Sequence, residues 1–150
     1  MPLRVVIDPN VLVSAAISPA GATAAIVGLI DAGAITAIVS PRLLTELGGV
    51  LRREKFRTWL GLDEVAAYVD ELERLAELVD DPSEVPIVSP DPDDDYLIAI
   101  ARHADADALV SGDTDLTDLA LADLPTLTPR QLLGELAATF DDPPLGSDQT

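Results

Sequence analysis

Short apolar runs alternate along this chain with longer segments in which apolar residues recur every three or four positions. The short runs are typical of strands buried in a parallel sheet, and the longer segments are typical of helices packed against it. We expect strands at residues 3–7, 34–39, 108–110 and 124–127. We expect helices at residues 9–17, 22–32, 41–51, 62–79, 93–104, 117–122 and 129–140. Strands that alternate with helices predict a three-layer α/β/α fold with a central parallel sheet.

Turn and capping residues mark the boundaries of these elements. Gly33 ends the second helix, and Ser40 and Pro41 open the third as N-cap and first helical residue. Residues 80–92 are rich in Pro, Asp and Ser and are expected to form a loop, in which 85–88 are a candidate short strand. Residues 1–140 form one predicted domain, and the acidic, proline-rich residues 141–150 are expected to be a disordered tail.

The composition limits the chemistry that is available. The 150 residues contain no cysteine and one histidine, His103, which excludes disulfides and thiolate metal sites and argues against a histidine-based zinc site. A metal would have to be a hard cation held by carboxylates. The first residues lack the pattern of a signal peptide and no apolar run has the length of a membrane span, so we expect a cytoplasmic protein with no membrane association.

The formal net charge of −18 argues against a nucleic-acid partner, but the positive charge is concentrated. Five of the nine basic residues lie between positions 42 and 57: Arg42, Arg52, Arg53, Lys55 and Arg57. Two interpretations stay open: these side chains bind RNA phosphates, or they form a solvated helix end where the helix dipole favours positive charge. In the same segment, Phe56 and Trp59 are expected to pack in the core or at a dimer contact, with stacking on RNA bases as the alternative.

Four acidic residues stand where this fold would bring side chains together. Asp8 and Asp113 each follow a predicted strand. Asp94 begins a helix, and Glu46 lies within the helix after the second strand. Each has an ordinary explanation as a helix N-cap, a first-turn acid or a solvated helix residue. Four carboxylates packed without a cation would raise one another's pKa, whereas Mg²⁺ or Mn²⁺ would stabilise the group and activate a water for attack on a phosphodiester.

Four segments, taken in order, resemble the successive motifs of PIN domains. These are VVIDPNVLVSA, SPRLLTELGGVL, DPDDDYLIAIA and ADALVSGDTDL, and the resemblance covers residues 3 to about 139. The chain is most similar to the VapC-like ribonuclease toxins of toxin–antitoxin systems. The resemblance implies a metal-dependent endoribonuclease, with Mg²⁺ or Mn²⁺ as cofactor, RNA as substrate, a homodimer as assembly and a cognate antitoxin as inhibitor.

The resemblance also assigns roles to single residues. The expected catalytic and metal-binding acids are Asp8, Glu46, Asp94 and Asp113. The expected accessory residues are Asn10, Asp95, Ser111 and Asp115, with Asp95 as the alternative to Asp94 in the third motif. One departure concerns Pro9, which stands where the family has Thr or Ala and which removes a backbone N–H and any hydroxyl.

Other classes of protein are weighed against this interpretation. Phosphatases of the haloacid dehalogenase type and receiver domains also place acids at strand ends, but both need a lysine late in the chain, and the only lysine is Lys55. The phosphatases also need an aspartate where this chain has Asn10. A non-catalytic PIN-fold binding module is favoured by Pro9 and the negative charge, whereas the presence of all four acids favours the enzyme.

Overall fold

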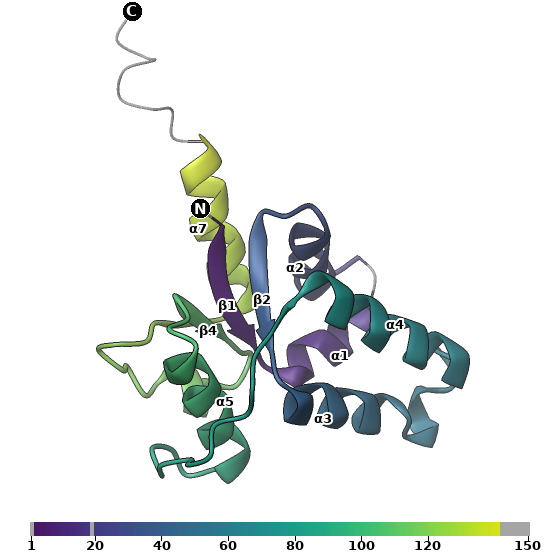
Figure 1. The fold of residues 1–150 in the computed structure, drawn as a ribbon. Coiled ribbons are helices and arrows are strands. Elements are labelled where there is room, and N and C mark those ends of the chain that lie inside the picture. The colour runs from purple at the N-terminus through teal and green to yellow at the C-terminus, as the bar shows by residue number, and fades with distance from the viewer. Residues whose placement is uncertain (1, 19, 142–150) are drawn as a thin grey trace, which may run out of the picture.

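The computed structural model describes residues 2–18 and 20–141 and contains a central sheet of five parallel strands. The strands are β1 (Leu3–Ile7), β2 (Ile35–Val39), β3 (Glu77–Leu78), β4 (Ala108–Val110) and β5 (Thr126–Leu127). Their order across the sheet is β3-β2-β1-β4-β5, with β1 in the centre (Figure 1). The predicted α/β fold with a parallel sheet is therefore confirmed.

Helices cover the two faces of this sheet. They are α1 (Pro9–Ile17), α2 (Ala22–Asp31), α3 (Pro41–Leu51), α4 (Leu62–Leu75), α5 (Pro92–His103), α6 (Thr114–Thr117) and α7 (Pro129–Asp141), with a 3₁₀ turn at Glu54–Phe56. The chain moves outward from β1 to β3 and then crosses back to β4 and β5. Because such crossovers are right-handed, this reversal places α5 on the opposite face from α1 and α2. Consistently, α5 packs on β1 and β4, while α2 packs on β2 and α7.

The central strand β1 is buried because it has a neighbour on each side. Its residues Val5, Val6 and Ile7 are at most 1% exposed. Val5 pairs with Ala37 of β2 and with Ala108 of β4. A strand enclosed in this way favours an uninterrupted apolar sequence, which is the pattern that predicted it.

Capping residues set the helix boundaries as expected. The Ser40 hydroxyl accepts a hydrogen bond from the Leu43 N–H at 3.2 Å, and Pro41 is the first residue of α3. Gly33 follows α2 with a φ of +78°, a conformation that favours glycine.

Three local predictions were wrong. The fourth helix ends at Leu75 instead of Val79, because Glu77 and Leu78 leave it to pair with Ile38 and Val39 of β2 as an edge strand. Residues 85–88 form no strand. The short helix α6 spans Thr114–Thr117 instead of 117–122, because Asp113 caps it by accepting a hydrogen bond from the Asp115 N–H.

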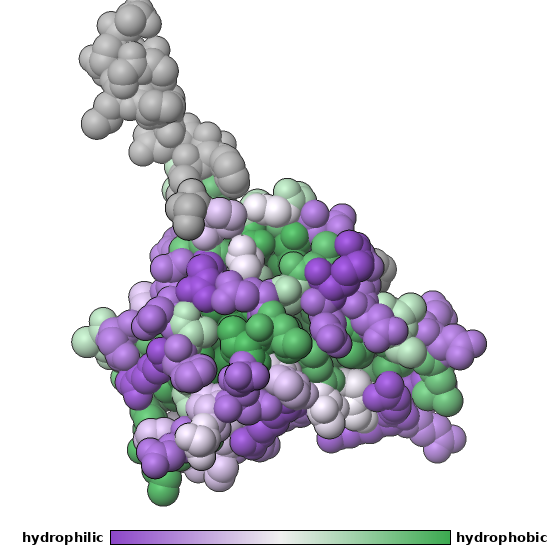
Figure 2. Space-filling model, viewed as in Figure 1, coloured by the Kyte–Doolittle hydropathy of each residue, from purple (hydrophilic) through white to green (hydrophobic). Residues whose placement is uncertain are grey.

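Two parts of the molecule extend away from the sheet. Helices α3 and α4 pack against each other as a hairpin, at the right of Figure 1. Near its turn Phe56 is buried, whereas Trp59 and Leu62 are 55% and 57% exposed. The loop between β3 and α5 projects at the lower left, where Figure 2 shows apolar atoms at the surface, and its Ile87 is 92% exposed.

No single helix of the described residues is long and apolar enough to cross a membrane, although α1 and α2 taken as a bent pair meet that test by length and composition. Of the predicted disordered tail, residues 142–150 lie outside the part of the chain that the structure describes.

Arg4 joins three elements at the amino end of the sheet. Its guanidinium pairs with Glu77 of β3 at 2.6 Å and donates to the carbonyl oxygens of Ala104 and Asp105, just after α5, at 2.8 and 3.2 Å. These contacts lie at the end of β1 opposite to Asp8. They therefore stabilise the fold away from the four acids predicted for the site.

We expect Arg4→Met to lower the free energy of unfolding by about 1–3 kcal/mol, because several hydrogen bonds to a charged donor are lost. Urea unfolding followed by circular dichroism measures this. The matched control is Arg74→Met, which removes an exposed ion pair to Glu71 within α4 and should change stability by less than about 0.5 kcal/mol. Equal losses in the two variants would contradict the proposed role of Arg4.

Candidate active site

The acids gather where the strand order reverses. In an open parallel sheet, ligands bind outside the carboxyl ends of the strands at such a point. Asp8 directly follows β1, and Ser111 directly follows the adjacent β4. The Asp8 N–H also donates to the Val110 carbonyl oxygen at 2.9 Å, which continues the pairing of the strands into the site.

Asp8 is buried, with 5% of its surface exposed, and its carboxylate is hydrogen-bonded on both oxygens. Oδ1 accepts from the Asn10 N–H at 2.9 Å, and Oδ2 accepts from the Ser111 hydroxyl at 2.8 Å. Pro9 occupies the first position of α1, where a backbone N–H would have no partner within the helix. The proline therefore leaves the hydrogen bonding of the Asp8 carboxylate intact.

The Ser111 hydroxyl links the ends of the two central strands. Ser111 is fully buried, and its Oγ donates to Asp8 while it accepts from the Asp113 N–H at 3.0 Å. Asp113 in turn caps α6, where its carboxylate accepts from the Asp115 N–H at 2.9 Å. One hydroxyl thus fixes the position of Asp8 relative to Asp113.

Asp94 and Asp95 are both buried at the start of α5 but have different surroundings. Asp95 Oδ1 accepts hydrogen bonds from the Val88 N–H, the Ser89 N–H and the Ser89 hydroxyl at 3.0, 2.7 and 2.9 Å. Burial raises the pKa of Asp95, but these bonds outweigh it, so its pKa lies below its ordinary value. Asp95 therefore holds the preceding loop, whereas Asp94 Oδ2 is buried with no hydrogen-bond partner among the described residues.

Burial and the charges of neighbouring acids both raise the pKa of Asp94. Burial raises its pKa to about 6, assisted by the negative charges of Asp113, Asp91, Asp8 and Asp115. Burial also raises the pKa of Asp8, against the hydrogen bonds from Asn10 and Ser111, and the charges of Asp113 and Asp91 act in the same direction. The acids from β1, β4 and α5 thus form one electrostatically coupled group.

Asp91 belongs to this group although the motifs did not identify it. It is the N-cap of α5, and its carboxylate accepts a hydrogen bond from the Asp93 N–H at 2.9 Å. An aspartate directly before a proline at a predicted helix start is an N-cap signal that indicates its position.

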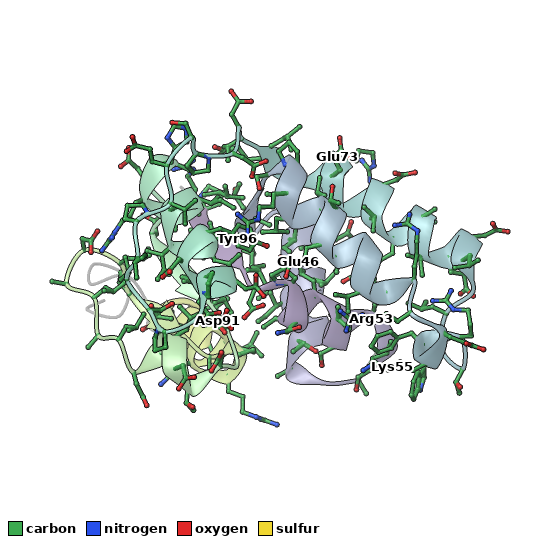
Figure 3. All side chains as sticks on the ribbon, turned by 90° about the horizontal axis from the view of Figure 1, so that it is seen from below. Glu46, Arg53, Lys55, Glu73, Asp91 and Tyr96 are labelled. Atoms are coloured by element: carbon green, nitrogen blue, oxygen red, sulfur yellow. The ribbon has the colours of Figure 1, made fainter. Side chains whose placement is uncertain are left out.

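Glu46 is connected to helix α5 of the site by a hydrogen bond from a tyrosine. It is half-buried on α3, and its Oε2 accepts a hydrogen bond from the hydroxyl of Tyr96 on α5. Figure 3 shows these two side chains next to each other. Glu46 is not among the largest contributions to the raised pKa values of Asp8 and Asp94. Among the four predicted acids, Asp8, Asp94 and Asp113 therefore form the coupled group, and Glu46 lies at its edge.

The five basic residues between 42 and 57 fall into two groups: four have exposed side chains, and one is hydrogen-bonded to the backbone. The ion pairs found among the described residues use Arg4, Arg74 and Arg102 and none of the basic residues between 42 and 57. The Arg57 guanidinium instead donates to the carbonyl oxygens of Leu51 and Arg53 at the end of α3. The other four basic side chains, Arg42, Arg52, Arg53 and Lys55, are exposed.

A pocket of about 390 Å³ opens beside Asp8 and Asp113. Its other lining residues are Asn10, Val11, Ser14, Thr23, Gly112 and Pro129. A larger pocket of about 450 Å³, between the loop after β3 and α5, contains Asp95 but none of the three coupled acids. Within the described residues, no three Asp, Glu or His side chains already stand in a ready-made cation site.

Comparison with known proteins agrees with the resemblance predicted from the four motifs. Residues 4–115 match the PIN domain family. The chain is 32% identical over 117 residues to the uncharacterized protein MJ1680 of Methanocaldococcus jannaschii, in an alignment that covers 78% of this chain and 75% of that protein.

Two solved structures share the fold. PAE2754 from Pyrobaculum aerophilum aligns with a TM-score of 0.62 and 18% identity, over 91% of this chain and 90% of that chain. VapBC2 from Rickettsia felis, bound to a DNA fragment from its promoter, aligns with a TM-score of 0.58 and 17% identity, over 84% of this chain and 98% of that chain. Since the family match spans most of its length, this chain belongs to the PIN domain family.

Proposed function

We propose that this protein is a divalent-metal-dependent endoribonuclease and the toxin component of a toxin–antitoxin pair. PIN domains are generally nucleases, and this favours hydrolysis of phosphodiester bonds over phosphatase or receiver chemistry. The observation that carries the proposal is Asp94, a buried carboxyl whose Oδ2 has no hydrogen-bond partner among the described residues and whose pKa is raised to about 6.

The donor set fits Mg²⁺ or Mn²⁺. Buried carboxylates raise one another's pKa when no cation is present, and a divalent cation would replace this repulsion with attraction. Carboxylate oxygens are the ligands that these ions prefer. Asp8, Asp94 and Asp113 would hold the ion, with Glu46 as a fourth ligand and Asp91 and Asp115 nearby. When bound, such an ion lowers the pKa of a water and offsets charge on a phosphodiester.

Other residues of the chain would orient the ligands and the substrate. The Ser111 hydroxyl and the Asn10 N–H hold the Asp8 carboxylate, and the Asp115 N–H holds that of Asp113. The exposed Arg42, Arg52, Arg53 and Lys55 would bind RNA phosphates on either side of the scissile bond. Arg57 is assigned a structural role because its guanidinium is bound to the end of α3.

The proposed partners are an antitoxin protein and a second copy of the chain. The fold shared with VapBC2 of Rickettsia felis supports the antitoxin. The exposed Trp59 and Leu62 near the turn of the α3–α4 hairpin support a protein interface. The net charge of −18 makes a non-catalytic binding module the second candidate, since it disfavours nucleic acid elsewhere on the surface.

We expect cleavage of a mixed RNA pool by the purified protein in Mn²⁺ or Mg²⁺ and none in EDTA. Asp8→Asn and Asp94→Asn should each lower the cleavage rate by at least about 100-fold, since loss of even an outer-shell partner costs about 10- to 100-fold. Asp123→Asn is the control, because this exposed acid pairs with Arg102 instead of the coupled group. Failure of the wild type to bind Mn²⁺ or to cut any RNA would favour the binding module.

The neighbours Asp94 and Asp95 should have opposite effects on the stability of the metal-free protein. Because its pKa is raised, ionised Asp94 destabilises the fold, so Asp94→Asn should be more stable than the wild type at pH 7. This difference should shrink below about pH 6 and vanish below 3.8, where Asp94 is protonated in both states.

The pKa of Asp95 is lowered, so Asp95→Asn should lose about 1 kcal/mol at pH 7 and should lose less only below the ordinary pKa of 3.8. Urea titrations of the metal-free protein between about pH 3 and pH 7 measure both variants. Destabilisation by Asp94→Asn at pH 7 would show that the acids do not repel one another.

The exposed basic residues should set RNA affinity. Arg53→Ala and Lys55→Ala should each weaken binding of a single-stranded RNA without changing sequence preference, and each should reduce the dependence of log Kd on log salt by about 0.7. Arg74→Ala is the control, because that exposed arginine is paired with Glu71. Fluorescence anisotropy between 50 and roughly 200 mM salt measures the slopes. An unchanged slope in both test variants would restrict the segment to a structural role.

A further inference from the structure

Tyr96 connects the two helices that carry Glu46 and Asp94. It lies on α5, two residues after Asp94, and it is 1% exposed. Its hydroxyl donates to Glu46 Oε2 on α3, and the guanidinium carbon of Arg42 lies 4.0 Å from the centre of its ring. The negative charge of Asp8 also raises the pKa of Tyr96, although burial and Glu46 have larger effects. Tyr96 is thus in contact with one expected ligand and near another.

The two tyrosines of the chain differ in the partner of their hydroxyl. The other tyrosine of the chain, Tyr68 on α4, donates to the backbone carbonyl of Leu12 at 2.8 Å, which satisfies its hydroxyl without a charge. Tyr96 instead bonds to a carboxylate in a region already crowded with negative charge. Hydrogen bonds to an ionised acceptor are stronger than neutral ones, and a planar buried ring leaves few alternative orientations to the hydroxyl.

Glu46 needs such a restraint more than the other acids do. Asp8 and Asp113 are fixed by backbone N–H groups next to them in sequence. Glu46 has a longer side chain on a helix surface, and immobilising it has a conformational entropy cost. The bond from Tyr96 occupies Oε2 and leaves Oε1 of the same carboxylate for a cation.

We propose that Tyr96 is a positioning residue: its hydroxyl fixes Glu46 as the fourth ligand of the cation, and its ring supports Arg42 at the edge of the site. This inference rests on the proposed function and extends it to a residue of the third motif to which the resemblance assigns no role. The phenol does not touch the reacting atoms. It determines where the one ligand that comes from α3 is held, and so couples the α3–α4 hairpin to the acids on the sheet.

The test is Mn²⁺ affinity of the metal-free full chain, measured by electron paramagnetic resonance, for Tyr96→Phe and the matched Tyr68→Phe. Both substitutions remove one phenolic hydroxyl, and phenylalanine at 96 keeps the ring under Arg42. Tyr96→Phe should weaken Mn²⁺ binding about 10- to 100-fold, the usual effect of losing an outer-shell partner. Tyr68→Phe should leave Mn²⁺ affinity unchanged, although urea unfolding should show that each variant loses some stability.

A double substitution separates positioning from a general structural effect. In a Glu46→Gln background, Tyr96→Phe should cause no further loss of Mn²⁺ affinity, because the residue through which it acts is already altered. Wild-type affinity in Tyr96→Phe would overturn the inference, and so would an equal loss in the Glu46→Gln background.

The proposed function can fail independently. A wild-type protein that binds Mn²⁺ but does not cut RNA would contradict the ribonuclease, while the comparison of the tyrosine variants would still decide the role of Tyr96. A wild-type protein that does not bind Mn²⁺ would overturn both.

Discussion

Repulsion between buried carboxylates is the interaction on which the site depends. The parallel pairing of β1 with β4 places Asp8 and Asp113 at one edge of the sheet. Asp94 comes from the start of α5, in the connection between β3 and β4. The protein offsets part of the repulsion with N–H groups at the starts of α1 and α6 and with the Ser111 hydroxyl. Asp94 receives no such compensation at Oδ2, so burial and the neighbouring charges raise its pKa.

Much of the fold could be predicted because its signals are local. A few neighbouring residues were enough to predict the buried strand before Asp8, the helix cap at Ser40 and the turn at Gly33. The edge strand β3 could not be predicted in this way. Its two residues continue the apolar spacing of α4, and only pairing with Ile38 and Val39 of β2, some forty residues earlier, makes them a strand. Tertiary pairing overrides a helical pattern here, because Val39 and Ile38 present open backbone groups to whatever segment follows.

The site shows the same division. Acids at strand ends could be proposed from sequence because the topology of a parallel sheet fixes where strand ends lie. Adjacent residues on a helix point about 100° apart, so the sequence could not decide whether Asp94 or Asp95 faces the acids and which one holds the loop. The bond between Tyr96 and Glu46 joins residues fifty positions apart and has no local signature. A match to the PIN domain family does not predict such contacts, because they depend on the particular residues of this chain.

The central position of β1 has a consequence for how the protein is made. Asp8 is synthesised about a hundred residues before Ser111, and β1 gains its second neighbour only when β4 pairs with it. Until that moment Asp8 lacks the hydroxyl of Ser111, and a chain that ends before Asp113 lacks one of the three coupled acids. The order of synthesis therefore delays the assembly of the acidic group until β4 and the residues that follow it have been made.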